Sequence, residues 1–446
     1  MAESESAVFS SVDAAVSAAT SAQRIFQRFP LEQRRAVIAA LRVVGVEHAA
    51  RWAQETVAET GMGRVEDKTE KNLLCAQHTP GVEDLSSRSV LSDQGLAVTE
   101  YAPFGVVVSV TPSNNPVATI VSNAIGILAA GNAVVFAPHP AAALVSLDAL
   151  QILARAACAA GAPPGLITTV SPPTNASTQE LLSHPGVTLN LVTGGPSIVK
   201  VAMSTGKVCK TIAAGPGNPP VVVDVTARFP ECVEHILRGA SFDNNLLCIA
   251  EKVVIVVEAV REPFLTALQN HPLARELSQS LMDDLAKLAF TQGQGQAEPV
   301  LNRAMVGRDA GVLARSVNFS VPESVRLLWG LVGPDHPFVR YEQLMPVLPV
   351  IFAKNFEEAV VLAVRVEGGN HHSAAVHSQD FGNLTTMARA LECSVFVSNA
   401  PILSGLGWRS GFASMSIGTP TGDGITKASN FVRPIQFSLA GSFRIT

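Results

Sequence analysis

Cys248 lies where a cysteine can do covalent chemistry. Segment 241–251 joins a predicted helix at 230–240 to a predicted strand at 252–257, and connections on a rigid scaffold often carry reactive groups. A thiolate there can attack an aldehyde carbon; the adduct then loses hydride and leaves a thioester. Backbone N–H groups and a nearby helix end would lower its pKa toward neutrality. The competing interpretation is a small buried hydrophobe, the usual role of free cysteine, which we assign to the other five cysteines.

Asn114 lies in a second polar loop, Thr-Pro-Ser-Asn-Asn-Pro at 111–116. Attack on a carbonyl leaves charge on its oxygen, and a side-chain amide together with the Cys248 backbone N–H can stabilise that charge. The same residue types also form good turns. Asn115 is the alternative donor.

Together, these two segments resemble the aldehyde dehydrogenase superfamily, in which Pro112, Asn114 and Pro116 match the pattern Pro-x-Asn-x-Pro. The resemblance covers nearly the whole chain. It is closest to the CoA-acylating branch, the propionaldehyde and acetaldehyde dehydrogenases of bacterial microcompartments. It implies an α/β fold of two doubly wound domains with a small oligomerisation hairpin and tail. The implied domains are 1–214 for NAD and CoA binding, 215–418 for the nucleophile, and 419–446 for a loop and an oligomerisation strand.

The cofactor side has no GxGxxG motif. Gly-Gly-Pro at 194–196 follows a predicted strand and precedes a predicted helix, and a helix N-terminus can accept a pyrophosphate, although such a triplet is often only a turn. Ala137 replaces the lysine that most superfamily members carry, as in the CoA-acylating branch. Glu342 matches the glutamate that binds the nicotinamide ribose; its alternative role is a solvated carboxylate. The resemblance assigns the nucleotide site to Thr111, Pro112, Pro138, His139, Thr193, Gly194, Gly195, Gly215, Glu342 and Leu344.

Ala213 is the most informative departure from the superfamily. Hydrolytic members carry a glutamate there as the general base that activates water, and alanine cannot accept a proton. The acyl-enzyme then needs a nucleophile that requires less activation, and the thiol of CoA fits. His371 or His372 could supply a substitute base, although adjacent histidines are more often structural.

The predicted reaction is therefore aldehyde + CoA + NAD → acyl-CoA + NADH, with ping-pong order. The resemblance implies that NAD and CoA share one site. Propionaldehyde is favoured by resemblance alone, because acetaldehyde differs by one methylene, worth only about 1–3 kcal/mol. The alternatives are a hydrolytic aldehyde dehydrogenase, which Ala213 disfavours, and a non-catalytic scaffold, which would be expected to lose Cys248 or Asn114.

Composition limits the other classes of function. The 446 residues are 47% hydrophobic and 15% charged, with a net charge of -5; this favours large cores and gives no basic field for nucleic acid. No CxxC or His-rich spacing indicates a metal site. Residues 1–5 do not look like a secretory leader, and the most apolar window, 118–137, is interpreted as helix, turn and strand and not as a membrane span. We expect a cytoplasmic location, inside a bacterial microcompartment by resemblance, and the family's N-terminal peptide for shell proteins is not found in this sequence.

Alternating strands and helices predict two parallel sheets with helices on both faces. Strands are predicted at 105–110, 133–136, 166–170, 189–192, 220–224, 252–257, 348–353 and 395–397. Helices are predicted at 8–26, 31–52, 118–130, 143–160, 177–183, 198–204, 230–240, 265–269 and 356–364. A hairpin at 90–108, with its core at about 90–105, and an edge strand at 431–443 are expected to meet a partner subunit, in a homodimer or homotetramer.

Overall fold

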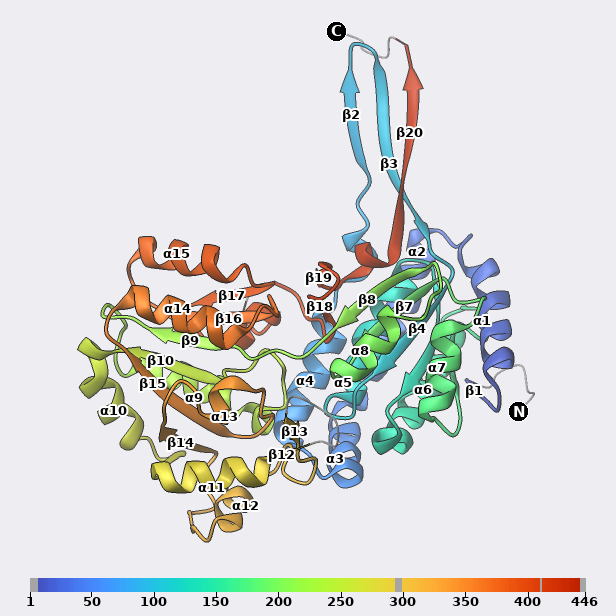
Figure 1. Ribbon diagram of the computed structural model, residues 1–446. Helices are drawn as coiled ribbons and strands as arrows, with labels where there is room; N and C mark the ends of the chain where they lie inside the picture. The colour runs from blue at the N-terminus through green and yellow to red at the C-terminus, as the bar shows by residue number, and fades with distance from the viewer. Residues whose placement is uncertain (1–6, 293–298, 410, 442–446) are drawn as a thin grey trace. The chain divides into compact units, whose positions relative to one another are not determined.

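The computed structural model describes residues 7–292, 299–409 and 411–441 (Figure 1). The chain divides into two compact units. Unit 1 comprises Met1–Glu55, Thr69–Ala214 and Phe412–Thr446, and unit 2 comprises Thr56–Lys68 and Gly215–Gly411. The predicted absence of a leader at 1–5 and the last residues of the predicted tail strand, 442–443, lie outside the described residues.

Unit 1 is built on a parallel sheet whose described strands have the order β1-β6-β5-β4-β7-β8. The strands are β1 (Val8–Phe9), β4 (Val106–Thr111), β5 (Ala133–Pro138), β6 (Ile167–Val170), β7 (Leu189–Thr193) and β8 (Lys210–Ala214). The helices are α1 (Val12–Phe26), α2 (Leu31–Glu47), α5 (Pro116–Ala129), α6 (Ala143–Ala159), α7 (Asn175–Ser183) and α8 (Pro196–Met203). Helices α3 (Ala49–Thr60) and α4 (Val65–His78) each belong partly to unit 1 and partly to unit 2. Right-handed crossovers place α5 and α6 on one face and α7 and α8 on the other. The strand order reverses between β4 and β7, and this reversal is the switch point where ligands bind in such folds.

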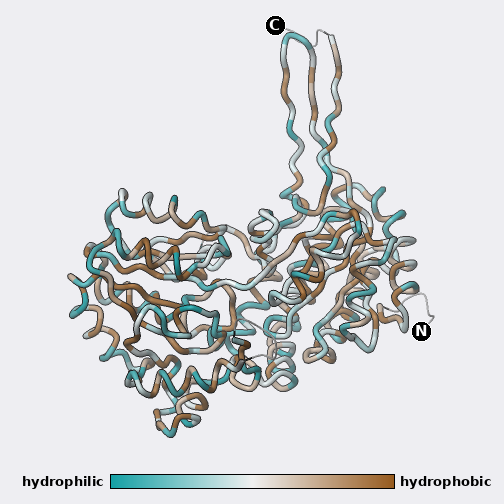
Figure 2. The backbone as a smooth tube through the Cα atoms, viewed as in Figure 1, coloured by the Kyte–Doolittle hydropathy of each residue, from teal (hydrophilic) through white to brown (hydrophobic). Residues whose placement is uncertain are grey.

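The apolar runs predicted for unit 1 are buried. Every residue of β4, β5 and α5 is buried, so the apolar window at 118–137 is a core helix, a turn and a central strand (Figure 2). By length and composition alone, Pro140–Ala159 would pass as a membrane span. This segment is a short 3-10 turn followed by α6, which packs against α2, α5 and β6, as a core helix does.

Two predicted helices of unit 1 need correction. Val8–Phe9 is a strand paired with β6, and the helix starts after the N-cap Ser11, whose side chain accepts the Ala14 N–H. The predicted helix at 31–52 is two helices, α2 and α3, separated at His48. Apolar residues at helical spacing continue across Ser11 and across His48, so the periodicity alone does not show that a helix starts at the first and is interrupted at the second.

A three-stranded antiparallel sheet in unit 1 joins distant parts of the chain. Strand β3 (Gly95–Pro103) pairs with β2 (Arg88–Ser92) on one side and with β20 (Val432–Ala440) on the other. Large apolar side chains on this sheet are exposed, among them Val90 at 68% and Phe437 at 59%. The predicted hairpin and tail strand are therefore neighbours within one chain.

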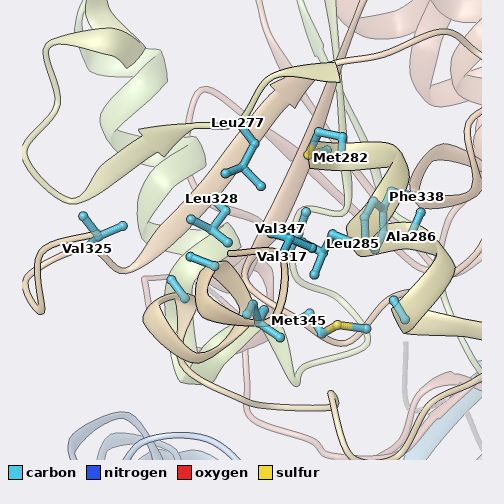
Figure 3. Close-up of a cluster of buried hydrophobic side chains, with 14 residues drawn as sticks. Leu277, Met282, Leu285, Ala286, Val317, Val325, Leu328, Phe338, Met345 and Val347 are labelled. Atoms are coloured by element: carbon cyan, nitrogen blue, oxygen red, sulfur yellow. The ribbon is translucent and has the colours of Figure 1, made fainter. Parts of the chain in front are cut away.

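Unit 2 contains a second parallel sheet whose described strands have the order β11-β14-β15-β10-β9-β16-β17. The strands are β9 (Pro220–Val223), β10 (Val253–Val257), β11 (Ala274–Glu276), β14 (Leu327–Leu331), β15 (Val347–Ala353), β16 (Ser373–His377) and β17 (Val395–Ser398). The helices are α9 (Glu231–Ser241), α10 (Arg261–Gln269), α11 (Gln279–Ala289), α12 (Ala310–Ser316), α13 (Pro337–Arg340), α14 (Phe356–Glu367) and α15 (Phe381–Leu391). Figure 3 shows a core cluster in which Met282, Leu285 and Phe338 pack near Leu328 and Val347.

Candidate active site

The nucleophile loop of unit 2 precedes strand β10. Cys248 lies in a turn closed by the Ala250 N–H and the Leu247 carbonyl, and its side chain is partly exposed. The sulfur accepts the N–H groups of Cys248 and Ile249, which favours a thiolate, but desolvation raises the pKa to about 12. Desolvation outweighs the two amide donors here, so the pKa rises where the sequence predicts a fall toward neutrality.

Buried ionisable groups surround this loop. Lys252 is fully buried and donates to the Asn245 carbonyl at 2.8 Å; its desolvation lowers the pKa, and Glu342 and Cys248 oppose that effect. Glu251 is also buried, and desolvation raises its pKa to about 8. One Glu251 oxygen accepts the Ile402 N–H, and Gly239 makes room for the other, since a Cβ there would lie 1.8 Å from it.

His372 and Glu342 approach the nucleophile loop through Gly217. A Cβ on Gly217 would lie 2.8 Å from the His372 Cγ and 2.9 Å from the Cys248 carbonyl oxygen. His372 is buried, and desolvation lowers its pKa to about 4, so the imidazole is neutral at physiological pH. No described group hydrogen-bonds its Nε2. The Glu342 carboxylate accepts the Gly217 N–H, and desolvation raises its pKa.

His371 and Leu344 both have a left-handed backbone conformation, but in two different settings. His371 has a φ of 51° and its ring contacts the Leu391 carbonyl, so it has a structural role in the turn before β16. Leu344 has a φ of 49°, which is unusual for a branched residue and often marks a functional loop. Its carbonyl accepts the Gly307 N–H at 2.9 Å. Gly215, another predicted nucleotide residue, is buried at the start of unit 2.

In unit 1 the predicted site residues gather after the ends of central strands. Thr111 and Pro112 end β4 and start the loop that carries half-buried Asn114 into α5. The buried Lys71 ammonium donates to the side-chain oxygen of the neighbouring Asn115. Asn115 is therefore a structural group that holds this loop, which favours Asn114 as the oxyanion donor.

The other predicted nucleotide residues of unit 1 follow β5 and β7. His139 follows Pro138 and caps a short 3-10 turn by accepting the Ala141 N–H. Thr193 contacts the Ser416 hydroxyl at 2.6 Å. Gly194 lies close to Ile198, and Gly195 is the exposed N-cap of α8 with no atom within 4 Å of an added Cβ. Strands β4, β5 and β7 are adjacent, so these residues share one edge of the sheet.

Ala213 lies within β8 and is fully buried. Its N–H is donated to Thr421, and Gly418 packs against the neighbouring Ile212. No carboxylate base stands at this position. Within the described residues, no group of three or more His, Cys, Asp or Glu could hold a metal ion.

Sequence reasoning missed the buried cations Lys68, Lys71 and Lys252. The sequence predicts Lys252 as the first residue of a strand, and the charged pattern of 65–71 is typical of a solvated helix face. The signal available for Lys252 was a Glu-Lys pair directly between a candidate nucleophile and an apolar strand.

The aldehyde dehydrogenase family model matches residues 1–311. The chain belongs to the aldehyde dehydrogenase family. It is 46% identical over 446 residues to an acetylating acetaldehyde dehydrogenase of Salmonella typhimurium, covering 99% of this chain and 94% of the relative. A propionaldehyde dehydrogenase of Rhodopseudomonas palustris, crystallised with CoA bound and an acylated cysteine, matches with a TM-score of 0.94, 38% identity and 99% of both chains.

A third member of the aldehyde dehydrogenase family comes from a microcompartment. The propionaldehyde dehydrogenase of the fucose-utilisation microcompartment of Clostridium phytofermentans matches with a TM-score of 0.94 and 37% identity, covering 99% of this chain and 100% of that one. The predicted family and fold are confirmed, and Asn114 in unit 1 and Cys248 in unit 2 remain predicted catalytic partners.

Proposed function

We propose that this chain oxidises a short aliphatic aldehyde to its CoA thioester: R–CHO + CoA–SH + NAD⁺ → R–CO–S–CoA + NADH + H⁺. The observation that carries the proposal is Ala213, buried in β8 where hydrolytic members place their base. CoA-acylating relatives that span nearly the whole chain support it.

In the proposed first half-reaction, the Cys248 thiol loses its proton to solvent, the sulfur bonds to the aldehyde carbon, and the carbonyl oxygen becomes an oxyanion. The Asn114 amide and the Cys248 N–H donate to that oxygen, and removing one such donor costs roughly 2.7–4 kcal/mol of barrier. NAD, when bound, accepts the hydride that leaves the same carbon. The product of this half-reaction is a thioester on Cys248.

In the second half-reaction, the CoA thiolate attacks the thioester carbon, and the Cys248 thiolate leaves. Neutral His372, with its unshared Nε2, is the base we propose for the CoA thiol, and it lies against Gly217 beside the Cys248 backbone. This assignment takes up the less favoured of the two sequence interpretations, in which one of the adjacent histidines supplies a substitute base.

The residues present fit a dinucleotide. Thr111 Oγ1 and Glu342 Oε1 are buried, and no described group hydrogen-bonds them, so a ribose or nicotinamide amide would satisfy them. The exposed Gly195 N-cap leaves the first N–H groups of α8 open to a pyrophosphate. We propose that Pro112, Pro138, His139, Thr193, Gly194, Gly215 and Leu344 line the same nucleotide site, with NAD preferred over NADP.

Propionaldehyde is the proposed main substrate, with acetaldehyde as the alternative. The relatives include enzymes named for each aldehyde, and one methylene changes transition-state binding by only about 1–3 kcal/mol. The ratio of kcat/KM for the two aldehydes decides between them.

The exposed apolar side chains of the β2-β3-β20 sheet support a homodimer or homotetramer, because a strand edge of this kind usually finds cover. Truncation before residue 431 removes β20 and is expected to give monomers or aggregates in light scattering. A monodisperse dimer or tetramer of the truncated chain would count against this interface. We further propose, from the Clostridium relative, a cytoplasmic protein housed in a bacterial microcompartment.

The decisive experiment withholds CoA. With NAD and propionaldehyde, NADH should appear as a burst of about one equivalent per active site and then stop, because Ala213 replaces the carboxylate that activates water in hydrolytic members. Intact-protein mass should show one acyl group, absent from the Cys248→Ala control, and added CoA should restore turnover. Sustained CoA-free turnover to free acid would leave the hydrolytic alternative standing, and no NADH with or without CoA would favour a non-catalytic scaffold.

A further inference from the structure

Three consecutive residues in front of Cys248 have left-handed backbones. Asp243, Asn244 and Asn245 have φ values of 46°, 53° and 62°, and all three are buried. Such a backbone conformation is strained for a residue other than glycine and persists only where its surroundings enforce it. The other left-handed non-glycine residues among those described occur singly. We call residues 243–245 the left-handed run.

Asp243 is held by the segment that begins α4. The Lys68 ammonium lies 3.1 Å from its carboxylate, and the two side chains are 3% and 0% exposed. The Arg64 N–H donates to the same carboxylate at 2.8 Å, and the Asp243 N–H donates to Asp67 at 2.9 Å. Gly63 packs so closely that a Cβ would lie 2.1 Å from the carboxylate.

The other two residues of the left-handed run are held from different segments. The Asn244 amide donates to the Gly307 carbonyl and to Asp309, each at 2.9 Å. The Asn245 amide donates to the carbonyls of Ala240 and Glu251, each at 2.9 Å. The run therefore has little freedom to relax to an ordinary backbone.

A buried ion pair is a poor device for stability alone, because well-packed apolar residues often do as well. The left-handed run fixes the path of the chain into the turn at Cys248, and that path sets where the sulfur and the Cys248 N–H point. We propose that Lys68, through its ion pair with Asp243, is a positioning residue for the nucleophile. This inference rests on the proposed function, in which the Cys248 sulfur and N–H act together on one carbonyl.

The test uses the double variant Lys68→Met/Asp243→Asn, which removes both charges and keeps a residue type that tolerates a positive φ. On mixing with NAD and propionaldehyde without CoA, the rate constant of the NADH burst per active site should fall at least tenfold. The KM for NAD should stay unchanged. Lys68→Arg, which keeps a cation beside Asp243, should have a higher burst rate than the double variant.

The matched control is Lys427→Met/Asp84→Asn, which removes another ion pair in unit 1, outside the proposed site. It should keep the wild-type burst rate even if its unfolding midpoint falls. A burst rate within twofold of wild type in Lys68→Met/Asp243→Asn would overturn the inference, whatever its stability. If Lys68→Met/Asp243→Asn does not fold, Asp243→Asn alone takes its place, because it keeps an acceptor for Lys68 and Arg64. A tenfold fall in its burst rate would support the inference, and a burst rate within twofold of wild type would overturn it. Failure of the proposed function is distinct, because wild type itself would then give no burst.

Discussion

In unit 1 the predicted site residues follow the ends of strands, whereas in unit 2 they precede the starts of strands. Thr111, Pro138 and Thr193 each end a strand of the first sheet, while Cys248 and His372 come just before β10 and β16. The carboxyl edge of a parallel sheet leads into helix N-termini, whose free N–H groups can bind phosphate with few side chains.

The amino edge of a parallel sheet offers no such helix N-termini. The nucleophile loop instead follows the C-terminal end of α9, where the helix dipole disfavours a thiolate. Unit 2 surrounds this loop with buried Lys252, Glu251 and the Lys68–Asp243 pair. At the predicted site of unit 1 backbone groups predominate, with buried Lys71 holding the Asn115 side chain, whereas several buried charges surround the nucleophile loop of unit 2.

The largest expected effect is at the amino edge. Cys248→Ala should abolish NADH formation and leave the unfolding midpoint nearly unchanged, because a partly exposed thiol contributes little packing. Absorbance at the NADH band and thermal unfolding check this, with Cys209→Ala as the control that keeps full turnover. Retention of a tenth of wild-type turnover in the Cys248 variant would refute the assignment.

The carboxyl edge is tested by Asn114→Ala. We expect kcat to fall by roughly 10²–10³ with little change in NAD affinity, because the amide acts on charge that develops only in the transition state. Steady-state kinetics and nucleotide titration measure the two quantities. Collapse of NAD binding with an unchanged kcat would instead make Asn114 a nucleotide residue.

The smallest expected effect is on the stability of the fold and comes from the buried carboxyl group of Glu251. The folded pKa of Glu251 is about 8, above its unfolded value of about 4.3. Between these values the folded state holds a proton that the unfolded state releases, so stability falls as pH rises through this window. Glu251→Gln removes that loss.

The unfolding midpoint of Glu251→Gln should therefore exceed that of wild type by several degrees at pH 9, with little difference at pH 5. Scanning calorimetry across this pH range measures the difference. A difference independent of pH would show that Glu251 does not titrate on unfolding in this window.

Most of unit 1 could be predicted from sequence because its strands are long apolar runs bounded by turn residues. Strands β4, β5 and β7 and helix α5 were found within a few residues of their observed ends. Val8–Phe9 was missed because a two-residue strand has no periodicity of its own, and its strand character comes from pairing with β6.

The polar core of unit 2 could not be predicted in the same way. Strands β11 and β14 are short and include Arg275 and Gly330, so neither has a clear strand pattern. A buried lysine and a solvated one look alike in a single sequence. Cys248 and Asn114 are predictions from their loops and from the resemblance, whereas the burial of Lys68 and Lys252 became visible only in the structure.

The pairing of β3 with β20 has a consequence for synthesis on the ribosome. Gly95 pairs with Ala440 and Pro103 with Val432, so about three quarters of the 446-residue chain separates the two strands in sequence. At 5–20 residues per second, the first strand waits roughly 20–70 s for its neighbour to be made. Most of unit 2 is continuous from Gly215 to Gly411 and can begin to fold during that wait. Assembly of the β2-β3-β20 sheet of unit 1, with its exposed apolar side chains, is therefore deferred until β20 has been synthesised.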